Sequence, residues 1–175
     1  TFTTGDNTVF GSEDGFTFSG GTSTVSDGGL VEADHFLITD GTNTVEGGTT
    51  GGLLHVLSGG KGLEFGGTNS PTLLLEADNA VAGRLLLEAD VTVNNTLTSG
   101  TAAILPTGSG TNPGTVDLGG VSRNFVIGDG SAANDLHIGA QIANGGIVKT
   151  GQGTLRLSAA NTYQGTTVVN GGWVS

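Results

Sequence analysis

The sequence of 175 residues has no cysteine and no methionine, and it contains only 3 prolines, 1 tryptophan and 1 tyrosine. Without cysteine the chain has no disulfide scaffold, no thiol chemistry and no metal site with Cys ligands. Its length is sufficient for one domain with a hydrophobic core. Because large side chains are few, with 7 phenylalanines the most numerous aromatic type, the sequence suits a long and narrow core.

Positive charge is also scarce. The chain has 16 acidic side chains but only 5 basic ones, and its formal net charge is −11. The basic residues never cluster in the sequence, so they cannot form the patch that attracts nucleic acid or an anionic membrane surface. We therefore expect no nucleic-acid partner, and we interpret the acidity as a source of solubility and mutual repulsion. The basic residues are Lys61, Arg84, Arg123, Lys149 and Arg156.

Long apolar runs are missing as well. No stretch approaches the ~20 apolar residues of a membrane-spanning helix, and residues 1–6 lack the charged and hydrophobic regions of a signal peptide. The chain also begins without Met and stops at Ser175, where another strand would begin. We expect no membrane insertion, and we interpret the sequence as a processed polypeptide or a piece of a longer one.

Glycine is abundant, with 34 residues, and Thr, Ser and Asn accompany it. Since glycine supplies the positive φ values of tight turns, this composition predicts many short strands joined by turns. A flexible linker has a similar composition, but the 35% hydrophobic content, arranged in regular groups of Leu, Val and Ile, argues against one. No window combines helical periodicity with caps, so we expect very little helix.

Strand candidates recur about every ten residues and are separated by Gly, Asn or Asp. A β-sandwich has the same spacing, so the spacing alone leaves the architecture open. Upstream of residue 115 the candidates are 7–10, 15–19, 22–25, 30–32, 35–39, 43–45, 53–57, 63–65, 72–76, 84–88, 91–93, 96–98 and 102–105.

The segment from Gly145 to Trp173 favours one architecture. It predicts a strand, a glycine turn, a second strand, an Asn-Thr-Tyr-Gln-Gly turn and a third strand. Apolar and small polar residues alternate in these strands, so each has one face to bury and needs neighbours above and below. The segment resembles the autotransporter-associated β-strand repeat, roughly Gly-Gly-Leu-x-Lys-x-Gly-x-Gly-Thr-Leu-x-Leu-Ser-Gly-x-Asn-Thr-Tyr-x-Gly-x-Thr-x-Val-Asn-x-Gly. Ala159 or Ala160 replaces a glycine of the pattern, and Trp173 replaces a small residue.

The resemblance extends more loosely upstream, so 115–174 is the best-matching part of what we expect to be a single domain over 1–175. The family implies an all-β, right-handed parallel β-helix, or β-solenoid, as found in secreted passenger regions of Gram-negative autotransporters and in other long bacterial surface proteins. It implies an extracellular location at the cell surface but no particular activity. A lack of cysteine suits a chain that crosses an outer membrane unfolded.

An internal repeat adds a candidate metal site. Leu73–Asp78 has the sequence Leu-Leu-Leu-Glu-Ala-Asp, which returns in Leu85–Asp90, with a weaker echo in Leu30–Asp34. In a solenoid, acidic corners of this kind can stack and bind calcium through carboxylate oxygens. The same residues also suit solvated turns that hydrogen-bond their own backbone. We favour the turns and expect no cofactor and no metal site.

Few residues occur in patterns that are typical of catalytic sites. His35, His55 and His137 are far apart in sequence and belong to no metal-ligand motif. Two Asp/His combinations occur, Asp34 with His35 and Asp135 with His137. Only the second has the i, i+2 spacing that puts both side chains on one face of a strand. A β-helix enzyme acting on polysaccharides would need paired carboxylates, for which Glu76, Asp78, Glu88 and Asp90 are available. We expect no catalytic or cofactor-binding residues, because nucleophile, base and orienting group never occur together.

The ends of the predicted solenoid carry the functional hypothesis. A β-helix without caps ends in unpaired backbone groups, which another chain can cover. We expect a non-catalytic structural protein whose copies stack head to tail into an extracellular filament by contacts that do not close a ring. The first alternative is a fragment of an adhesin passenger that binds glycans or abiotic surfaces, as in biofilm adhesion. The second alternative is a polysaccharide-degrading β-helix enzyme.

Overall fold

The computed structural model describes residues 2–3, 9–12, 15–94 and 100–175. The described residues form strands and turns without any helix, so no helix long enough to cross a membrane occurs among them. Every pairing between named strands is parallel, and residues of successive coils lie in register, as Phe125 and Lys149 do. The prediction of an all-β parallel β-helix is therefore confirmed.

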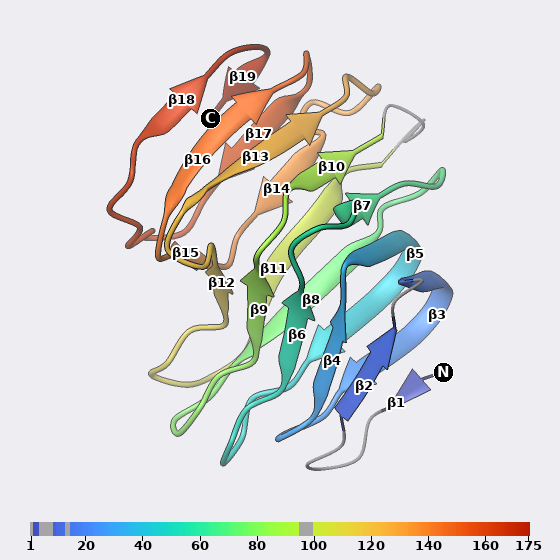
Figure 1. Ribbon diagram of the computed structural model, residues 1–175, viewed down its shortest axis with the longest axis vertical. Helices are drawn as coiled ribbons and strands as arrows, with labels where there is room; N and C mark the ends of the chain where they lie inside the picture. Colours follow the sequence, from blue (N-terminus) through green and yellow to red (C-terminus); the bar gives the residue numbers. More distant parts are fainter. Residues whose placement is uncertain (1, 4–8, 13–14, 95–99) are drawn as a thin grey trace.

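The chain winds through three faces in turn, and each face is a stack of parallel strands (Figure 1). The first face is a separate six-stranded sheet. Its strands are β2 (Val9–Ser12), β4 (Leu30–Ala33), β6 (Leu53–Val56), β9 (Arg84–Leu87), β12 (Thr115–Asp117) and β15 (Gln141–Ala143).

The second and third faces belong to one 13-stranded sheet, because β3 (Phe16–Val25) and β5 (His35–Val45) run around the corner between them. Residues 35–38 of β5 pair with β7, whereas residues 42–45 pair with β8. The second face continues with β7 (Gly62–Phe65), β10 (Val91–Val93), β13 (Ser122–Ile127), β16 (Gly146–Thr150) and β18 (Thr167–Val169). The third contains β1 (Phe2–Thr3), β8 (Thr72–Ala77), β11 (Ala102–Gly108), β14 (Leu136–Ile138), β17 (Thr154–Leu157) and β19 (Trp173–Val174).

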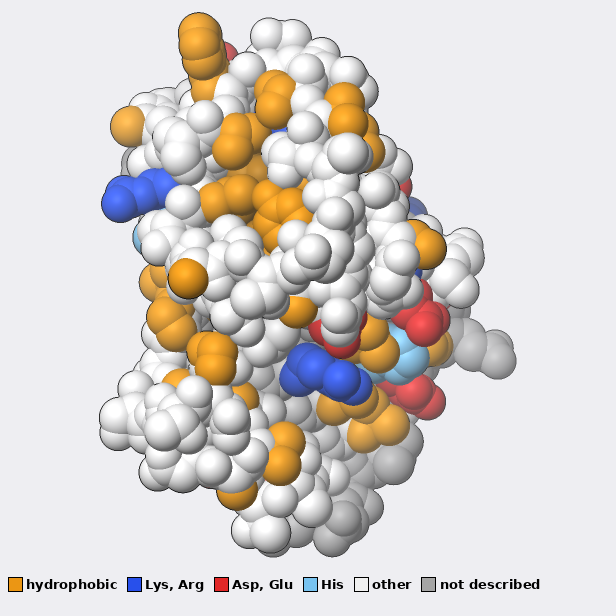
Figure 2. All heavy atoms as spheres, turned by 90° about the vertical axis from the view of Figure 1, so that its left-hand side faces the viewer, with side chains coloured by type: hydrophobic (Ala, Val, Ile, Leu, Met, Phe, Trp, Pro, Cys, Tyr) orange, Lys and Arg blue, Asp and Glu red, His pale blue; other side chains and the backbone are white. Residues whose placement is uncertain are grey.

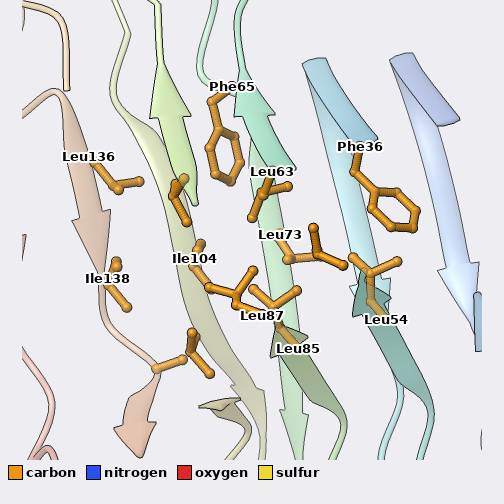
Figure 3. Packing of buried hydrophobic residues seen from close by; sticks show 14 of the residues in the cluster. Phe36, Leu54, Leu63, Phe65, Leu73, Leu85, Leu87, Ile104, Leu136 and Ile138 are labelled. Atoms are coloured by element: carbon orange, nitrogen blue, oxygen red, sulfur yellow. The ribbon is translucent and has the colours of Figure 1, made fainter. Parts of the chain in front are cut away.

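The core is the interior of the coil. Buried and partly exposed residues alternate along β4, β5 and β6, because successive side chains of a strand point to opposite faces. Parallel registers then place Phe36, Leu63, Val91 and Phe125 in one column, and each is fully buried. Figure 3 shows Leu and Phe side chains from the three faces meeting in this interior. Burial of each such side chain contributes about 1.5–3 kcal/mol.

Glycine allows the corner of β5. Gly41 has φ 81°, and a Cβ atom at this position would lie 2.3 Å from the backbone oxygen of Gly21 in the preceding coil. A side chain is therefore excluded both by the backbone conformation and by the neighbouring coil. The two separate strands that we predicted over 35–39 and 43–45 are one bent strand in the structure, and so are those over 15–19 and 22–25.

A carboxylate fixes the corner between the third and first faces. One oxygen of Asp27 accepts hydrogen bonds from the backbone N–H groups of Thr50 and Gly51 at 2.9 and 2.7 Å and from the Thr50 hydroxyl at 3.0 Å. The other oxygen accepts the N–H of Thr49 at 2.9 Å. The backbone N–H of Thr50, followed by that of Thr49, lowers the pKa of Asp27 below its ordinary value. Asp27 thus ties its own turn to the loop of the next coil.

The remaining strand predictions agree with the structure in location, and 91–93 coincides with β10, whereas most others differ in length. β8 and β11 are longer than predicted, and β1, β15 and β19 were not predicted. Of the predicted strand 7–10, residues 7 and 8 lie outside the described residues, as does the whole of 96–98. The three strands predicted in the C-terminal segment are β16, β17 and β18, in the predicted order.

Candidate functional site

The outer surface of the first face carries side chains of several chemical types. In-register pairing stacks Leu30, Leu53 and Arg84 in one outward column. A neighbouring column contains Glu32, His55, Leu86 and Asp117. Figure 2 shows basic, acidic and histidine side chains gathered in one place on the molecular surface, with hydrophobic side chains beside them. The solenoid thus assembles a mixed polar and apolar surface from residues far apart in sequence.

Arg84 lies at the centre of this surface. Three adjoining hollows of about 460, 480 and 320 Å³ all include Arg84 in their walls. Its side chain is 46% exposed, and its guanidinium lies 3.7 Å from a carboxylate oxygen of Asp117. Within the described parts of the chain this is the only ion pair of Arg84, and its guanidinium donates no hydrogen bond there. Most of its five N–H donors therefore face solvent or the hollows.

Asp117 is held more tightly than Arg84. One carboxylate oxygen accepts the backbone N–H of Gly119 at 2.9 Å, and the other accepts the side-chain amide of Asn144 at 3.1 Å. Asn144 has φ 54° and is the one residue other than glycine with a positive φ among those described. Asn tolerates this conformation better than most residues. Asp117, Asn144, Leu86 and Gln164 line the hollow of about 480 Å³ together with Arg84.

The histidines have partners that the sequence did not reveal. His55 lies between two carboxylates, with Nδ1 3.6 Å from Glu32 and Nε2 3.5 Å from Glu88. His35 contacts Glu64 at 3.1 Å instead of Asp34. All three carboxylates belong to other coils, at separations that no local motif displays. Only the register of the coils could have identified them.

The Asp135 and His137 pair does not form. The carboxylate of Asp135 is buried and accepts the backbone N–H groups of Gly130 and Thr154, both at 2.7 Å. The ring of His137 contacts the hydroxyl of Ser158 at 2.8 Å. Burial, and then the charge of Arg156, lowers the pKa of His137. Asp135 precedes the strand β14, so the alternation rule that suggested the pair does not apply to it.

The repeated acidic segments lie in different sheets. Leu73–Asp78 includes β8 of the third face, whereas Leu85–Asp90 includes β9 of the first face. Their carboxylates therefore do not stack. Three of these carboxylates instead each accept a hydrogen bond from a backbone N–H group. The donors are Gly47 for Glu76 at 3.0 Å, Ala80 for Asp78 at 2.7 Å, and Asn124 for Asp90 at 2.9 Å. In the described part of the chain, no group of three or more His, Cys, Asp or Glu residues is placed to hold a metal ion.

A buried lysine is the feature that sequence analysis missed. Lys149 lies beside Phe125 in the interior column, one coil nearer the C-terminus, and is fully buried. Its ammonium donates to the backbone oxygens of Thr150, Gly151 and Gly171 at 2.8, 2.9 and 3.1 Å. These contacts use all three donors of the ammonium group and join one coil to the next. Burial lowers the pKa of Lys149, and the charge of Asp135 opposes this shift.

The last described coil contains β18 and β19, each at the edge of the described sheet. β18 pairs with β16 and β19 with β17, and neither has a second partner among the described strands (Figure 1). Val169 is in register with Lys149, so its side chain points to the interior, yet it is 48% exposed. Trp173 is 74% exposed on the same coil. Within the described residues, the last coil therefore leaves the interior-facing Val169 and one strand edge uncovered.

Residues 147–175 match the family described as passenger-associated-transport-repeat. The match covers β17, β18, β19 and most of β16, and it includes Lys149. No curated protein and no solved structure matches the chain. The resemblance to an autotransporter passenger repeat family is thereby confirmed for the C-terminal segment.

Proposed function

We propose that this chain is a non-catalytic structural module of a bacterial cell-surface protein, and that its copies associate end to end into an extracellular fibre. The passenger-associated repeat over 147–175 supports a passenger of the autotransporter type at the surface of a Gram-negative bacterium. The parallel β-solenoid supports a scaffolding role, since such a coil is lengthened simply by adding further coils.

The observation that carries the fibre proposal is that β18 and β19 have no second partner among the described strands. A coil added above β18 and β19 would pair with their free backbone edges and cover Val169, which is otherwise half-exposed. At the other end, the rings of Phe16 and Phe18 stack on Phe36 with centroids 5.6 and 6.3 Å away. Phe16 and Phe18 are partly buried and pack against the core. A contact between two different ends of the solenoid joins copies head to tail and extends without closing.

The test is negative-stain electron microscopy of the native protein, with the mass of the polypeptide measured on the same preparation. Thin filaments built from chains near 17.2 kDa would support end-to-end association of separate copies. Isolated short rods at every concentration would contradict it. A much larger polypeptide would instead support covalent continuation of the coil within a longer passenger.

A matched pair of variants tests the role of the C-terminal end. Val169→Lys places a charge on the open end, and Val126→Lys places one on the lateral surface, where Val126 is 41% exposed. We expect filaments to be lost with the first variant and kept with the second. Equal assembly by both variants would show that the end formed by β18 and β19 is not the contact.

The lateral surface favours a second candidate function. An adhesin passenger binds its target through a side of the solenoid, and the first face offers the hollows around Arg84. This function is compatible with end-to-end association, because the two use different surfaces.

A further inference from the structure

We propose that the hollow formed by Arg84, Leu86, Asp117, Asn144 and Gln164 is a binding site for a neutral hexose unit of a polysaccharide. The hollow lies on the lateral surface, and although Gln164 belongs to the last coil, none of the hollow's lining residues lies in β18 or β19, so this inference goes beyond fibre formation and does not depend on it. Its volume of about 480 Å³ falls within the ~300–1,000 Å³ that is typical of small-molecule sites.

The polar groups of the hollow match hydroxyl groups. Arg84 offers unused N–H donors, and the carboxylate of Asp117 offers acceptor positions beyond the two that Gly119 and Asn144 occupy. A sugar hydroxyl both donates and accepts, so neighbouring hydroxyls can bond a guanidinium and a carboxylate at once. At 3.7 Å the contact between Arg84 and Asp117 is too long for a good hydrogen bond. A ligand can therefore bond either group without breaking a strong one.

The site is built in advance, because its carboxylate acceptor is fixed by the fold. Asp117 is only 12% exposed at its side chain, and two hydrogen bonds fix its carboxylate. Asn144 has a left-handed backbone conformation, and its side-chain amide donates a hydrogen bond to Asp117. A Cβ atom at Gly120 would meet nothing within 4 Å, so this wall opens to solvent. Preformed geometry reduces the entropy lost when a ligand binds, and Leu86 offers an apolar surface for the C–H groups of a sugar ring.

Charge selects a neutral sugar over an acidic one. Arg84 and Asp117 cancel each other locally, and the chain as a whole carries −11. The carboxylate of a uronate would be attracted by Arg84 but repelled by the carboxylate of Asp117 in the same hollow. Like charges at close range disfavour such a complex. The second hollow beside Arg84, of about 460 Å³, is lined by Leu30, Leu53 and Val81 and lies along the same surface. Together the two hollows suit a chain of several sugar units better than a single sugar.

Titration of the ¹⁵N-labelled protein followed by NMR tests the proposal. The probes are cellotetraose, maltotetraose and a β-galactotetraose, and tetragalacturonate serves as an anionic control of the same length. We expect saturable shifts of the backbone signals of Gly119 and Gly120 and of the side-chain amides of Asn144 and Gln164 with at least one neutral probe. Probe concentrations up to about 10 mM detect even a millimolar complex.

Variants tie the signal to the hollow. Arg84→Ala and Gln164→Ala are expected to weaken binding, the first by about tenfold or more, because a hydrogen bond to a charged group is lost. Arg156→Ala removes an exposed cation from the third face and is expected to bind as the wild type does. Far-UV circular dichroism checks that each variant is folded. If Arg84→Ala does not fold, Gln164→Ala alone still tests the hollow. The proposal is overturned by an absence of shifts with every neutral probe, by tighter binding of tetragalacturonate, or by unchanged binding in both hollow variants.

Discussion

Replacement of Lys149 by methionine tests how the last two coils are joined. Methionine keeps the length of the apolar part of the side chain but removes the ammonium group. The backbone oxygens of Thr150, Gly151 and Gly171 then lose the donor that they share. Since Gly171 lies in the coil after that of Lys149, the loss falls on the contact between coils.

Two opposing terms set the size of the effect. Each buried carbonyl left without its donor costs about 1–3 kcal/mol, and three are affected. Against this, the variant no longer buries an ammonium group, which relieves a desolvation penalty of several kcal/mol. We expect the carbonyl term to exceed the desolvation term and the variant to lose about 2–4 kcal/mol of unfolding free energy.

Urea unfolding measures the loss with two signals. Far-UV circular dichroism follows strands in all coils, whereas the fluorescence of Trp173, the single tryptophan, follows the last coil. We expect the fluorescence midpoint of Lys149→Met to fall at least as far as the midpoint from circular dichroism. The control is Lys61→Met, because Lys61 is exposed in a turn and its loss should change the free energy by less than about 0.5 kcal/mol.

The pH dependence provides an independent check. The pKa of Lys149 is lowered in the folded protein, so between that lowered value and the ordinary 10.5 the unfolded chain binds more protons. Wild-type stability should therefore gain a contribution as the pH rises through this window, and Lys149→Met should lack it. Equal or greater stability of Lys149→Met at neutral pH would refute the reasoning, because burial of the charge would then outweigh its three hydrogen bonds.

The remaining predictions concern the corners and the core. Because the pKa of Asp27 is lowered below 3.8, its contribution to stability should be complete above pH 3.8 and disappear as the pH falls through the lowered value. Asp27→Asn should lack this acid-dependent loss. Urea unfolding midpoints measured at several pH values would reveal the difference. Leu85→Ala should cost about 2–5 kcal/mol because Leu85 is fully buried, whereas its partly exposed neighbour Leu86→Ala should cost less than half as much in the same unfolding assay. Gly41→Ala should lower the thermal midpoint, since its new Cβ would lie 2.3 Å from the oxygen of Gly21, and a midpoint equal to that of the wild type would show that the corner adapts.

Sequence periodicity predicted the strands well because each strand buries one side against the interior. The alternation in β4, β5 and β6 is visible directly in the sequence. The assignment of strands to faces is not visible, because loops between coils differ in length. Leu73–Asp78 and Leu85–Asp90 show this, since their identical sequences occupy the third and first faces.

Contacts between coils account for what sequence analysis missed. The partners of His55 come from the coils before and after it, and those of Lys149 include Gly171 in the next coil. A lysine among alternating apolar residues looks like an outward side chain. In the structure the parallel register places it next to Phe125 in the interior, where backbone carbonyls replace water as its partners. The hollow at Arg84 likewise combines residues from several coils.

The scarce cations bear on how copies of the solenoid can associate. Lys149 is used inside the coil, and Arg123 donates to the backbone oxygens of Leu118 and Glu88, so neither neutralises acidic side chains of the lateral surface. The excess of 16 acidic over 5 basic residues then acts between molecules and disfavours contact of one lateral face with another. The described strands pair along the stack, so their unpaired edges face along its axis and not toward its sides. Under the proposed function, the same shortage of positive charge that excludes nucleic acid also directs association to the ends of the solenoid.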